Sequence, residues 1–400
     1  MDTKVNNREP LIFIVTGETS GDHLAGRLMA ALKRQTAGRI SFAGVGGAQS
    51  ESQGLKSLFP MSELSLVGLA EILPHLPRLI GRIRQTAAAA RDLKPDAVVT
   101  IDSPGFSFRL AHHLRGSGIP VIHYVAPQLW AWAPFRARKL KKRLDHVMAL
   151  LPFEVPFFAQ YGIPATYVGH PAIDAGAERG DGKAFRARHG FAPDAPVLCV
   201  LPGSRPGEVR RMLPVFGDAL ALLKERFPNL QIVIPVVDSV GEAVRDLTQN
   251  WPSPVIHVGM AERFDAFAAS DAAMAKSGTV TLELALAGVP MAVAYRVSPT
   301  TAFIVRRLGV SVEHASLVNL LLGRQVVPEF LQEDCTGPKI ADGVAEILTS
   351  EAVREAQQKD FKDVVKALGE PIPSPSERAA KLVLDIVRAR ALEIQPSSVD

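Results

Sequence analysis

The sequence predicts an α/β protein built from two Rossmann-like, doubly wound domains with parallel sheets. Three observations predict this fold class. The chain has 400 residues, which is long for one compact domain. Short apolar runs of strand length alternate with helical patterns in both halves, and small-residue turns follow several of these runs. Such alternation favours parallel sheets, because a crossover between parallel strands needs a helix.

The first half contains six runs that we expect to be strands, at 11–15, 40–42, 97–101, 121–124, 146–150 and 165–168. Helices are expected up to about residue 34 and at 106–114, 136–143 and 152–161. Between 61 and 84, large apolar residues mix with arginines, and Pro74 and Pro77 interrupt the pattern. Because proline removes a helical hydrogen bond and clashes with the preceding turn, we expect short helices there rather than one.

The second half repeats the alternation, with expected strands at 197–201, 231–236, 255–257, 271–275 and 291–294. Helices are expected at 208–226, at 279–287 and from about 336 to the end, with a break at 369–375. Residues 169–194 are rich in Gly, Asp, Arg and Pro and are interpreted as an inter-domain linker with one short helical piece. We therefore expect a first domain over 1–180, a second over 181–368, and a C-terminal helix in 369–400 that returns to the first domain.

Composition excludes several classes of protein. Hydrophobic residues make up 47% of the chain and charged residues 22%, so a large core can form and wholesale disorder is excluded. The formal charge of +4 is too small to indicate a nucleic-acid partner. Cys199 and Cys335 stand in no metal or redox spacing and no Asp-x-Asp occurs, so neither a disulfide framework nor a bound metal is predicted. No uncharged apolar run approaches about 18 residues, so we expect a soluble or membrane-surface protein.

The turn Pro202-Gly-Ser-Arg205 follows the apolar run 197–201 and precedes a helical pattern. Free backbone N–H groups and the helix dipole favour a phosphate at such a point, and the guanidinium of Arg205 suits phosphate oxygens. Gly203, Ser204 and Arg205 are therefore candidate phosphate-binding residues. The alternative is an ordinary strand-to-helix turn with a surface arginine.

A second turn of this kind, Ser277-Gly278-Thr279, opens a helix after the run 271–275. Thr279 suits the N-cap position, and Ser277 and Gly278 leave N–H groups accessible. Glu283, one turn into the helix, could accept hydrogen bonds from a ribose diol, or it could be favoured there only by the helix dipole. Two such turns in one domain favour a nucleotide diphosphate as the ligand.

In the first half, Asp102 directly follows the run 97–101, and the carboxyl ends of strands are where ligands bind in α/β sheets. Its carboxylate could take a proton from an attacking hydroxyl, or it could be a turn aspartate that binds its own backbone. The glycine-flanked turn 17–22 lacks the lysine of a P-loop. It could contact substrate hydroxyls or phosphate, or Asp22 could cap the helix.

Three further stretches could contact a sugar or a membrane. Gln128, Trp130 and Trp132 form an aromatic loop that could stack on a sugar face or pack as a core turn. Residues 66–84 mix apolar and basic side chains, and 136–143 are strongly basic. Together they favour an anionic bilayer surface or an acylated substrate, whereas the alternative for 136–143 is a solvated helix face.

These stretches together resemble one family, the lipid-A-disaccharide synthases, which are inverting two-domain GT-B glycosyltransferases of Gram-negative lipopolysaccharide assembly. The resemblance runs from about residue 11 to 350. The matching residues are Gly17-Glu-Thr-Ser-Gly-Asp22, Ile101-Asp102 with Pro104 and Phe106, His123-Tyr-Val125 with Pro127, Trp130-Ala-Trp132, Leu151-Pro-Phe-Glu154, Gly169-His170, Leu201-Pro-Gly-Ser-Arg205, Ser277-Gly-Thr279 with Leu282-Glu283, Tyr295-Arg296, and Ser316-Leu317 with Asn319-Leu320.

The resemblance implies a GT-B fold with two domains facing a cleft, and it implies the reaction. The donor would be UDP-2,3-diacylglucosamine and the acceptor 2,3-diacylglucosamine 1-phosphate, known as lipid X. The products would be the β-1',6-linked lipid A disaccharide 1-phosphate and UDP. Neither a cofactor nor a metal is implied. The enzyme would be cytoplasmic and peripheral on the inner membrane, with an acyl entrance near 66–80. The sequence does not choose between a monomer and a homodimer.

Carried over residue by residue, the resemblance makes Asp102 the general base on the acceptor 6-hydroxyl. Arg205 would neutralise charge on the departing diphosphate. The other implied donor-site residues are Gly203, Ser204, Ser277, Gly278, Thr279, Glu283 and Asn319. Glu18, Ser20 and Gln128 would border the acceptor. Gly105, which stands where the family pattern has an aspartate, and Pro206 depart from that pattern, which leaves open whether a second acidic group assists Asp102.

Two other functions remain as alternatives from the sequence. A non-hydrolysing UDP-sugar 2-epimerase would share the fold and the donor site, but it needs no acceptor and no membrane surface, so residues 66–84 disfavour it. A non-catalytic lipid or nucleotide carrier would give Asp102 and Arg205 no purpose.

Overall fold

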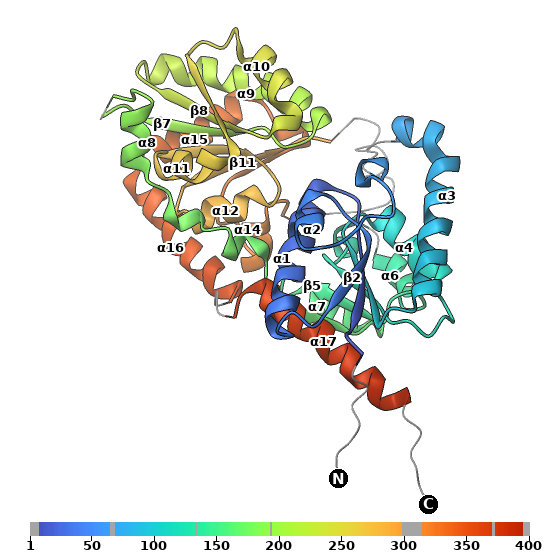
Figure 1. Cartoon of the computed structure of the whole chain (residues 1–400). Coiled ribbons are helices and arrows are strands. Elements are labelled where there is room, and N and C mark those ends of the chain that lie inside the picture. Colours follow the sequence, from blue (N-terminus) through green and yellow to red (C-terminus); the bar gives the residue numbers. More distant parts are fainter. Residues whose placement is uncertain are drawn as a thin grey trace, which may run out of the picture. The chain divides into compact units, whose positions relative to one another are not determined.

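The structure, a computed structural model, describes residues 8–64, 69–132, 134–192, 194–297, 314–369 and 373–394. The chain forms two compact units, each built on its own sheet (Figure 1). Unit 1 comprises Met1–Pro171 together with Pro371–Asp400, and unit 2 comprises Ala172–Glu370. The chain therefore leaves unit 1 and re-enters it near its end.

Unit 1 is built on a six-stranded parallel sheet with the order β2-β1-β3-β4-β5-β6. The strands are β1 (Leu11–Thr16), β2 (Ser41–Val45), β3 (Ala97–Ile101), β4 (Val121–Tyr124), β5 (His146–Ala149) and β6 (Ala165–Tyr167). The helices are α1 (Thr19–Gln35), α2 (Ala48–Ser52), α3 (Leu69–Leu93), α4 (Pro104–His113), α5 (Leu129–Trp132), α6 (Ala137–Leu140), α7 (Glu154–Ala159) and α17 (Pro375–Ile394), with the 3₁₀ turns η1 (Met61–Glu63) and η2 (Pro134–Arg136).

Helices cover both faces of this sheet, so the strands are apolar on both sides. On one face, Ile12 and Ile14 of β1 belong to a buried cluster with Leu28 of α1 and Val383 of α17. On the other face, Phe13 belongs to a cluster that includes α3 and α4. The sheet is therefore packed on both faces, and it positions the loops at its carboxyl edge.

The C-terminal helix α17 packs against α1 within unit 1 (Figure 1). Nε of Arg378 donates to the carbonyl of Val168 at 2.7 Å. In the same turn of α17, Oε1 of Glu377 lies 2.8 Å from Nε of Arg34. Apolar burial and these polar contacts hold the last helix on the first domain of the chain.

Helix α3 is one continuous helix of 25 residues, so the prediction of short helices over 61–84 is wrong where it covers this segment. Pro74 and Pro77 lie inside it, where each removes one backbone donor. The rest of the helix compensates, because residues 87–90 are four alanines and Ile83 and Ala87 are buried in the core. The basic helix expected at 136–143 is also shorter, because α6 spans only Ala137–Leu140.

Unit 2 is built on a second six-stranded parallel sheet with the order β12-β11-β10-β7-β8-β9. The strands are β7 (Val197–Leu201), β8 (Gln231–Val236), β9 (Val255–Gly259), β10 (Ala272–Lys276), β11 (Met291–Tyr295) and β12 (Glu329–Leu331). The helices are α8 (Gly182–Arg188), α9 (Pro206–Arg226), α10 (Gly241–Thr248), α11 (Arg263–Ala268), α12 (Val280–Leu286), α14 (Leu317–Leu322), α15 (Gly337–Thr349) and α16 (Glu351–Ala367). The edge strand β12 was not predicted, because its three residues are only half-buried and show no apolar run.

The segment interpreted as a linker is more ordered than expected. It contains η3 (Pro171–Asp174), η4 (Ala177–Arg179) and α8, and α8 packs on α11 in unit 2. A Cβ at Gly182 would lie 2.2 Å from the carbonyl oxygen of Ala268, so only glycine allows this approach. The packing makes most of the segment part of unit 2.

Two doubly wound parallel sheets confirm the predicted α/β class. Among the described residues, no helix is both long and apolar enough to cross a bilayer. No group of three His, Cys, Asp or Glu side chains in the described ranges is placed to hold a metal ion.

Candidate active site

In unit 1 the candidate residues follow three neighbouring strands. Thr16 of β1 pairs with Ile101 of β3, and Ile101 pairs with Tyr124 of β4. The turns that begin at Gly17, Asp102 and Val125 therefore lie side by side at the carboxyl edge of the sheet. This is the edge at which open α/β sheets bind ligands.

Asp102 has an unusual backbone conformation, with φ of 52°, and Ser103 follows with φ of 46°. These left-handed values are costly for residues with a Cβ and are maintained by neighbouring bonds. The N–H of Asp102 donates to the carbonyl of Tyr124 at 3.0 Å, and the Oγ of Ser107 donates to the carbonyl of Asp102 at 2.7 Å. Backbone bonds thus fix this half-buried residue, while its carboxylate has no hydrogen-bond partner among the described residues.

Gly17 packs closely on the same turn. A Cβ at Gly17 would lie 2.7 Å from Oγ of Ser103 and 3.3 Å from Cβ of Leu64, so a side chain would displace one of them. The Oγ of Ser103 is buried and has no hydrogen-bond partner within the described ranges. Ser103 thus packs the turn that carries Asp102 against the turn that begins at Gly17.

The other residues predicted at the acceptor side lie on the same edge. Glu18 is the half-buried N-cap residue of α1, and Ser20 is exposed in the first turn of that helix. Gln128 is exposed just before α5. The side chain of Trp132 lies outside the described residues. Asp22 has a structural role, because its carboxylate accepts bonds from the N–H groups of Gly47, at 2.8 Å, and of other residues that open α2.

Glu154 is a buried carboxyl that sequence reasoning assigned no role. Its Oε2 accepts the N–H groups of Leu150 and Leu151, both at 3.0 Å, and its Oε1 lies 3.3 Å from Nε1 of Trp130. Burial raises the pKa of Glu154 to about 7, although these three donors oppose the shift. Trp130 also meets Phe153 edge to face, with ring centroids 5.0 Å apart. The contacts with Glu154 and Phe153 therefore hold the Trp130 ring, as expected if the aromatic loop packs as a core turn.

His123, on β4, is a second buried titratable group of this edge. Its Nδ1 lies 2.8 Å from Oγ1 of Thr100, and its ring packs on Phe108 at 4.9 Å between centroids. Burial lowers the pKa of His123 to about 3, so the imidazole is neutral at physiological pH. Its Nε2 is buried without a hydrogen-bond partner in the part of the chain that the structure describes.

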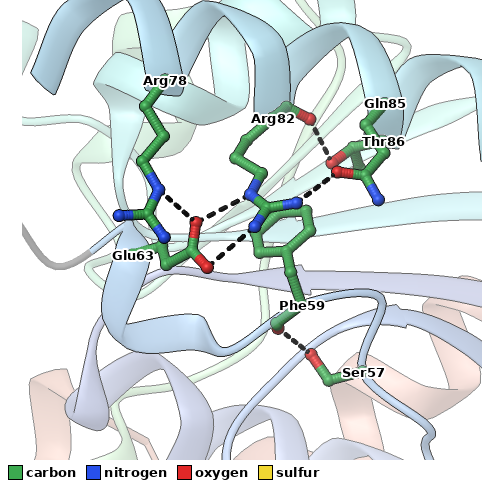
Figure 2. Close-up of polar contacts among 7 residues, drawn as sticks. All are labelled: Ser57, Phe59, Glu63, Arg78, Arg82, Gln85 and Thr86. Carbon is green, nitrogen blue, oxygen red and sulfur yellow. Dashed lines mark hydrogen bonds and ion pairs between the residues drawn. The ribbon is translucent and has the colours of Figure 1, made fainter.

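A salt-bridge cluster joins α3 to the segment that borders this edge (Figure 2). Glu63 accepts two bonds from Arg82, at 2.7 and 2.8 Å, and one from Arg78 at 2.9 Å. The guanidinium of Arg82 also lies 4.5 Å from the ring centroid of Phe59. These hydrogen bonds, first that from Arg82, lower the pKa of the Glu63 carboxyl. We name Glu63, Arg78 and Arg82 the α3 clasp.

In unit 2 the candidate residues follow β7, β10 and β11, which are also neighbours. Leu201 pairs with Ala275, and Lys276 pairs with Ala294. The turns 202–205 and 276–279 therefore lie side by side, as two phosphate-binding turns of one site would. Gly203 has φ of 110°, a region that residues with a Cβ rarely enter.

Arg205 is the N-cap residue of α9, and its side chain is 53% exposed. Glu208, in the first turn of α9, accepts the N–H of Ser204 at 3.2 Å. The same carboxylate lies 2.9 Å from Nζ of Lys276 and 3.8 Å from Nη1 of Arg205. Lys276 and Glu208 adjoin the two predicted turns in the sequence, but the pattern of these turns predicted no role for either side chain.

The turn after β10 differs in detail from the prediction. The buried Ser277 donates its Oγ to the carbonyl of Ala315 at 2.6 Å. Thr279 occupies the N-cap position of α12, but its exposed side chain makes no capping bond. Glu283 lies in the first turn of α12, with its Oε1 3.7 Å from Nη2 of Arg263.

Asn319, predicted in the donor site, is fully buried and fully hydrogen-bonded. Its Oδ1 accepts the N–H groups of Val326 and Val327, at 2.7 and 3.0 Å. Its Nδ2 donates to the carbonyl of Val327 at 3.0 Å and to Oε1 of Glu329 at 2.8 Å. Both donors and both acceptor positions are used, so this side chain can bind a ligand only by giving up a bond of the fold. Glu329 also accepts the N–H groups of Ala315 and Ser316, so the network holds the backbone that Ser277 contacts.

Comparison with known proteins identifies the family. The sequence model of the family described as Lipid-A-disaccharide synthetase matches residues 12–383. A lipid-A-disaccharide synthase from Rhodospirillum centenum is 51% identical over 385 residues, which are 96% of this chain and 96% of that protein. One from Paramagnetospirillum magneticum is 48% identical over 381 residues, which are 94% of this chain and 98% of that protein. The chain belongs to the lipid-A-disaccharide synthase family.

Family membership confirms the predicted function and enzyme class. The lipid-A-disaccharide synthases are glycosyltransferases of lipid A biosynthesis that condense the UDP-activated diacylglucosamine with lipid X. The resemblance found on the short stretches of sequence is therefore confirmed over nearly the whole chain.

Solved structures share the architecture at low sequence identity. Staphylococcus aureus MnaA with UDP matches with a TM-score of 0.63 and 13% identity, covering 98% of this chain and 100% of that one. The UDP-GlcNAc 2-epimerase from Neisseria meningitidis gives 0.62 and 14%, with 95% and 99% covered. Acinetobacter baumannii MurG gives 0.55 and 16%, with 94% and 99% covered. Such identities show the fold alone, so the synthase and epimerase alternatives are separated by the sequence family and not by the architecture.

Proposed function

We propose that this family member performs its transfer with Asp102 as general base in unit 1 and with the turns after β7 and β10 binding the UDP part of the donor in unit 2. The observation that carries the assignment is Asp102 itself. Its carboxylate stands at the carboxyl edge of the sheet without a hydrogen-bond partner among the described residues, on a strained backbone that two hydrogen bonds fix. Strain of this kind recurs at active sites.

The proposed chemistry is a single displacement. Asp102 takes the proton of the acceptor 6-hydroxyl while that oxygen attacks the anomeric carbon of the donor sugar. The new carbon–oxygen bond forms as the bond from the anomeric carbon to the β-phosphate oxygen breaks, and UDP leaves with the bonding electrons. Attack opposite the leaving group inverts the configuration and yields the β-linked disaccharide 1-phosphate.

Unit 2 is the proposed donor domain. Gly203, Ser204 and Arg205 stand at the start of the 21-residue helix α9, where N–H groups and the helix dipole favour a diphosphate. Ser277, Gly278 and Thr279 form the adjoining turn, and Glu283 is the proposed ribose acceptor. Asn319 supports this site through its bonds to the fold rather than by touching the donor.

Unit 1 is the proposed acceptor domain, and its surface is the proposed membrane contact. Glu18, Ser20 and Gln128 would border the acceptor sugar. Leu76 and Ile80 of α3 are 41% and 39% exposed, and Phe135, beside the basic residues 136–143, is 63% exposed. Exposed apolar side chains next to basic ones suit the cytoplasmic face of an anionic inner membrane and the acyl chains of both substrates.

Replacement of Asp102 tests the proposal. Asp102→Asn keeps the shape of the side chain but removes the base, so turnover should fall by roughly 10²–10⁴-fold. UDP affinity, measured by calorimetry, should stay within about twofold of wild type, because the base does not contact the leaving group. Asp92→Asn, at an exposed position on α3, is the matched control. Near-normal turnover in Asp102→Asn would remove this residue from the base role.

The dependence of UDP release on acceptor separates the transferase from the epimerase that shares the fold. With purified enzyme and the UDP-diacyl sugar alone, no UDP should appear; with lipid X, UDP and disaccharide should appear in equal amounts. Release of UDP at the same rate without acceptor would count against the transferase mechanism. Binding without turnover under both conditions would favour a carrier.

A further inference from the structure

We propose that Lys276 is a second cation for the donor diphosphate and that Glu208 holds it in place until the donor arrives. The inference deepens the proposed donor site and rests on the proposed function. It assigns roles to Lys276 and Glu208, whose side chains meet between the two proposed phosphate-binding turns.

Lys276 lies at the carboxyl edge of the sheet of unit 2. It is the last residue of β10, beside the end of β7, and the turn Ser277–Thr279 follows it directly. Its side chain is only 14% exposed. The Nζ lies 5.0 Å from the ring centroid of Tyr295, so the ammonium is held over an aromatic face at the end of the next strand.

Glu208 contacts three groups of the two proposed phosphate-binding turns. Its carboxylate takes the N–H of Ser204 at the start of α9, the ammonium of Lys276 at 2.9 Å, and the guanidinium of Arg205 at 3.8 Å. A backbone N–H at a helix start together with two cations is the set of groups that a phosphate recruits. The Glu208 carboxylate, only 17% exposed, therefore already contacts groups that phosphate oxygens would recruit.

The charges of these side chains also favour a diphosphate. Lys276 and Arg205 both face the one carboxylate of Glu208, so a diphosphate can recruit these cations without removing Glu208. Burial and the nearby Glu208 carboxylate raise the pKa of Tyr295, which keeps its hydroxyl protonated beside the cluster. When a diphosphate binds, the flexible stem of Lys276 can turn its ammonium from Glu208 to the β-phosphate, while the fixed fork of Arg205 needs little movement.

Close packing supports a fixed position for Glu208. A Cβ at Gly203 would lie 2.5 Å from Oε2 of Glu208 and 2.9 Å from its Cβ. The glycine therefore brings the turn directly against this carboxylate. On the Lys276 side, a Cβ at Gly278 would lie 3.7 Å from Nζ of Lys276.

The test compares Lys276→Met with Lys276→Arg, using UDP and uridine as probes in calorimetric titrations of the full chain. We expect Lys276→Met to weaken UDP binding by about 10–100-fold, because it removes one charge-assisted bond to phosphate. Uridine, which has no phosphate, should bind with unchanged affinity, and Lys276→Arg should recover most of the UDP affinity. Arg210→Met, which removes an exposed cation of α9, is the matched control and should change neither.

Glu208→Gln tests the placeholder role. Removal of the competing charge should raise UDP affinity by about 3–10-fold without changing uridine binding. UDP affinity that is unchanged in Lys276→Met, or lost together with uridine affinity, would overturn the assignment of Lys276, and a fall in UDP affinity in Glu208→Gln would overturn the placeholder. Either result leaves the proposed function standing if Arg205→Ala still weakens UDP binding. Failure of the wild-type chain to bind UDP would instead overturn the proposed donor site.

Discussion

At the scale of single residues, burial has the largest effect on protonation in unit 1. Glu154 is held between the carboxyl end of β5 and the Trp130 loop, and burial raises its pKa to about 7. His123 and His170 are shifted in the opposite sense, to about 3 and about 4, because burial disfavours their charged forms. Burial therefore favours the uncharged form of one carboxyl group and of two imidazoles within unit 1.

Glu154 gives a prediction for stability against pH. Its folded-state pKa lies above the unfolded value near 4.5, so the folded state binds the extra proton between pH 4.5 and 7. The contribution of this group to the free energy of unfolding is complete below pH 4.5. It is lost as pH rises through about 7, and the loss is up to about 3 kcal/mol. The buried histidines make the free energy of unfolding rise with pH below pH 6.5. Glu154→Gln keeps both histidines, so comparison with this variant isolates the effect of Glu154.

The measurement is urea unfolding of wild type and Glu154→Gln at several pH values between 4 and 8. Relative to Glu154→Gln, the free energy of unfolding of the wild type should fall as pH rises across this window. A difference that stays constant with pH would show that Glu154 titrates as an ordinary carboxyl. Glu355→Gln, at an exposed position of α16, is the control.

Some of the candidate residues could be predicted from the local sequence, and the roles of others could not. Strand-to-helix turns with Gly203 and Ser277 follow from apolar runs and glycine chemistry, and the structure places those turns side by side. The roles of Asn319 and Asp22 depend on partners 7 to 28 residues away that no local pattern shows. Lys276 and Glu208 meet across 68 residues, so only the fold brings them together.

At the scale of elements, the α3 clasp connects the apolar helix to the carboxyl edge of the sheet (Figure 2). Glu63 ends η1, and Leu64 after it lies close to Gly17. We therefore expect movement of α3 to be transmitted through Glu63 and Leu64 to the turn beside Asp102. We expect the clasp to keep this turn in place when α3 contacts a bilayer or an acyl chain.

Glu63→Gln tests the clasp. Loss of the carboxylate charge should increase amide hydrogen exchange in α3 after residue 76 and in 61–64, because Arg82 and Arg78 lose their common partner. The Michaelis constant for the acylated acceptor should rise while UDP affinity is unchanged. Arg84→Gln, at an exposed position of the same helix without a described salt bridge, is the control. Exchange that matches the wild type would show that packing alone holds α3.

The sequence did not predict two elements correctly, the continuous helix α3 and the edge strand β12. The continuous α3 passes through Pro74 and Pro77 because burial of its later residues outweighs the lost backbone bonds, a tertiary effect that propensity does not include. β12 exists because Val293 pairs with Glu329, and its own sequence has no apolar run. Long apolar strands such as β7 and β8 were predicted at their observed bounds because both faces are buried.

At the scale of the whole molecule, unit 1 is discontinuous in sequence, because α17 completes it after unit 2. Leu384 of α17 is 4% exposed and belongs to the same buried cluster as Ile12 and Ile14, whereas Leu392 of the same helix is 72% exposed. The stability of the first domain therefore depends on side chains almost at the end of the chain.

Leu384→Ala should destabilise unit 1 by about 2–5 kcal/mol, because it leaves a cavity between α17 and the sheet. Leu392→Ala should change stability by less than about 0.5 kcal/mol. Native-state hydrogen exchange of the β1 and β3 amides measures the effect within unit 1. Equal exchange in the two variants would mean that α17 contributes little to the core it covers.

The late position of α17 also fixes the order in which the protein can be finished during synthesis. Unit 1 begins to leave the ribosome first, yet its covering helix is translated only after the whole of unit 2. At about 5–20 residues per second, this delay is on the order of tens of seconds. Throughout that time the apolar side chains that α17 later covers, including Ile12 and Leu28, are open to water and to chaperones. The domain that is started first is thus the last to be completed, and a ribosome that stalls within unit 2 holds a chain whose first domain lacks its final helix.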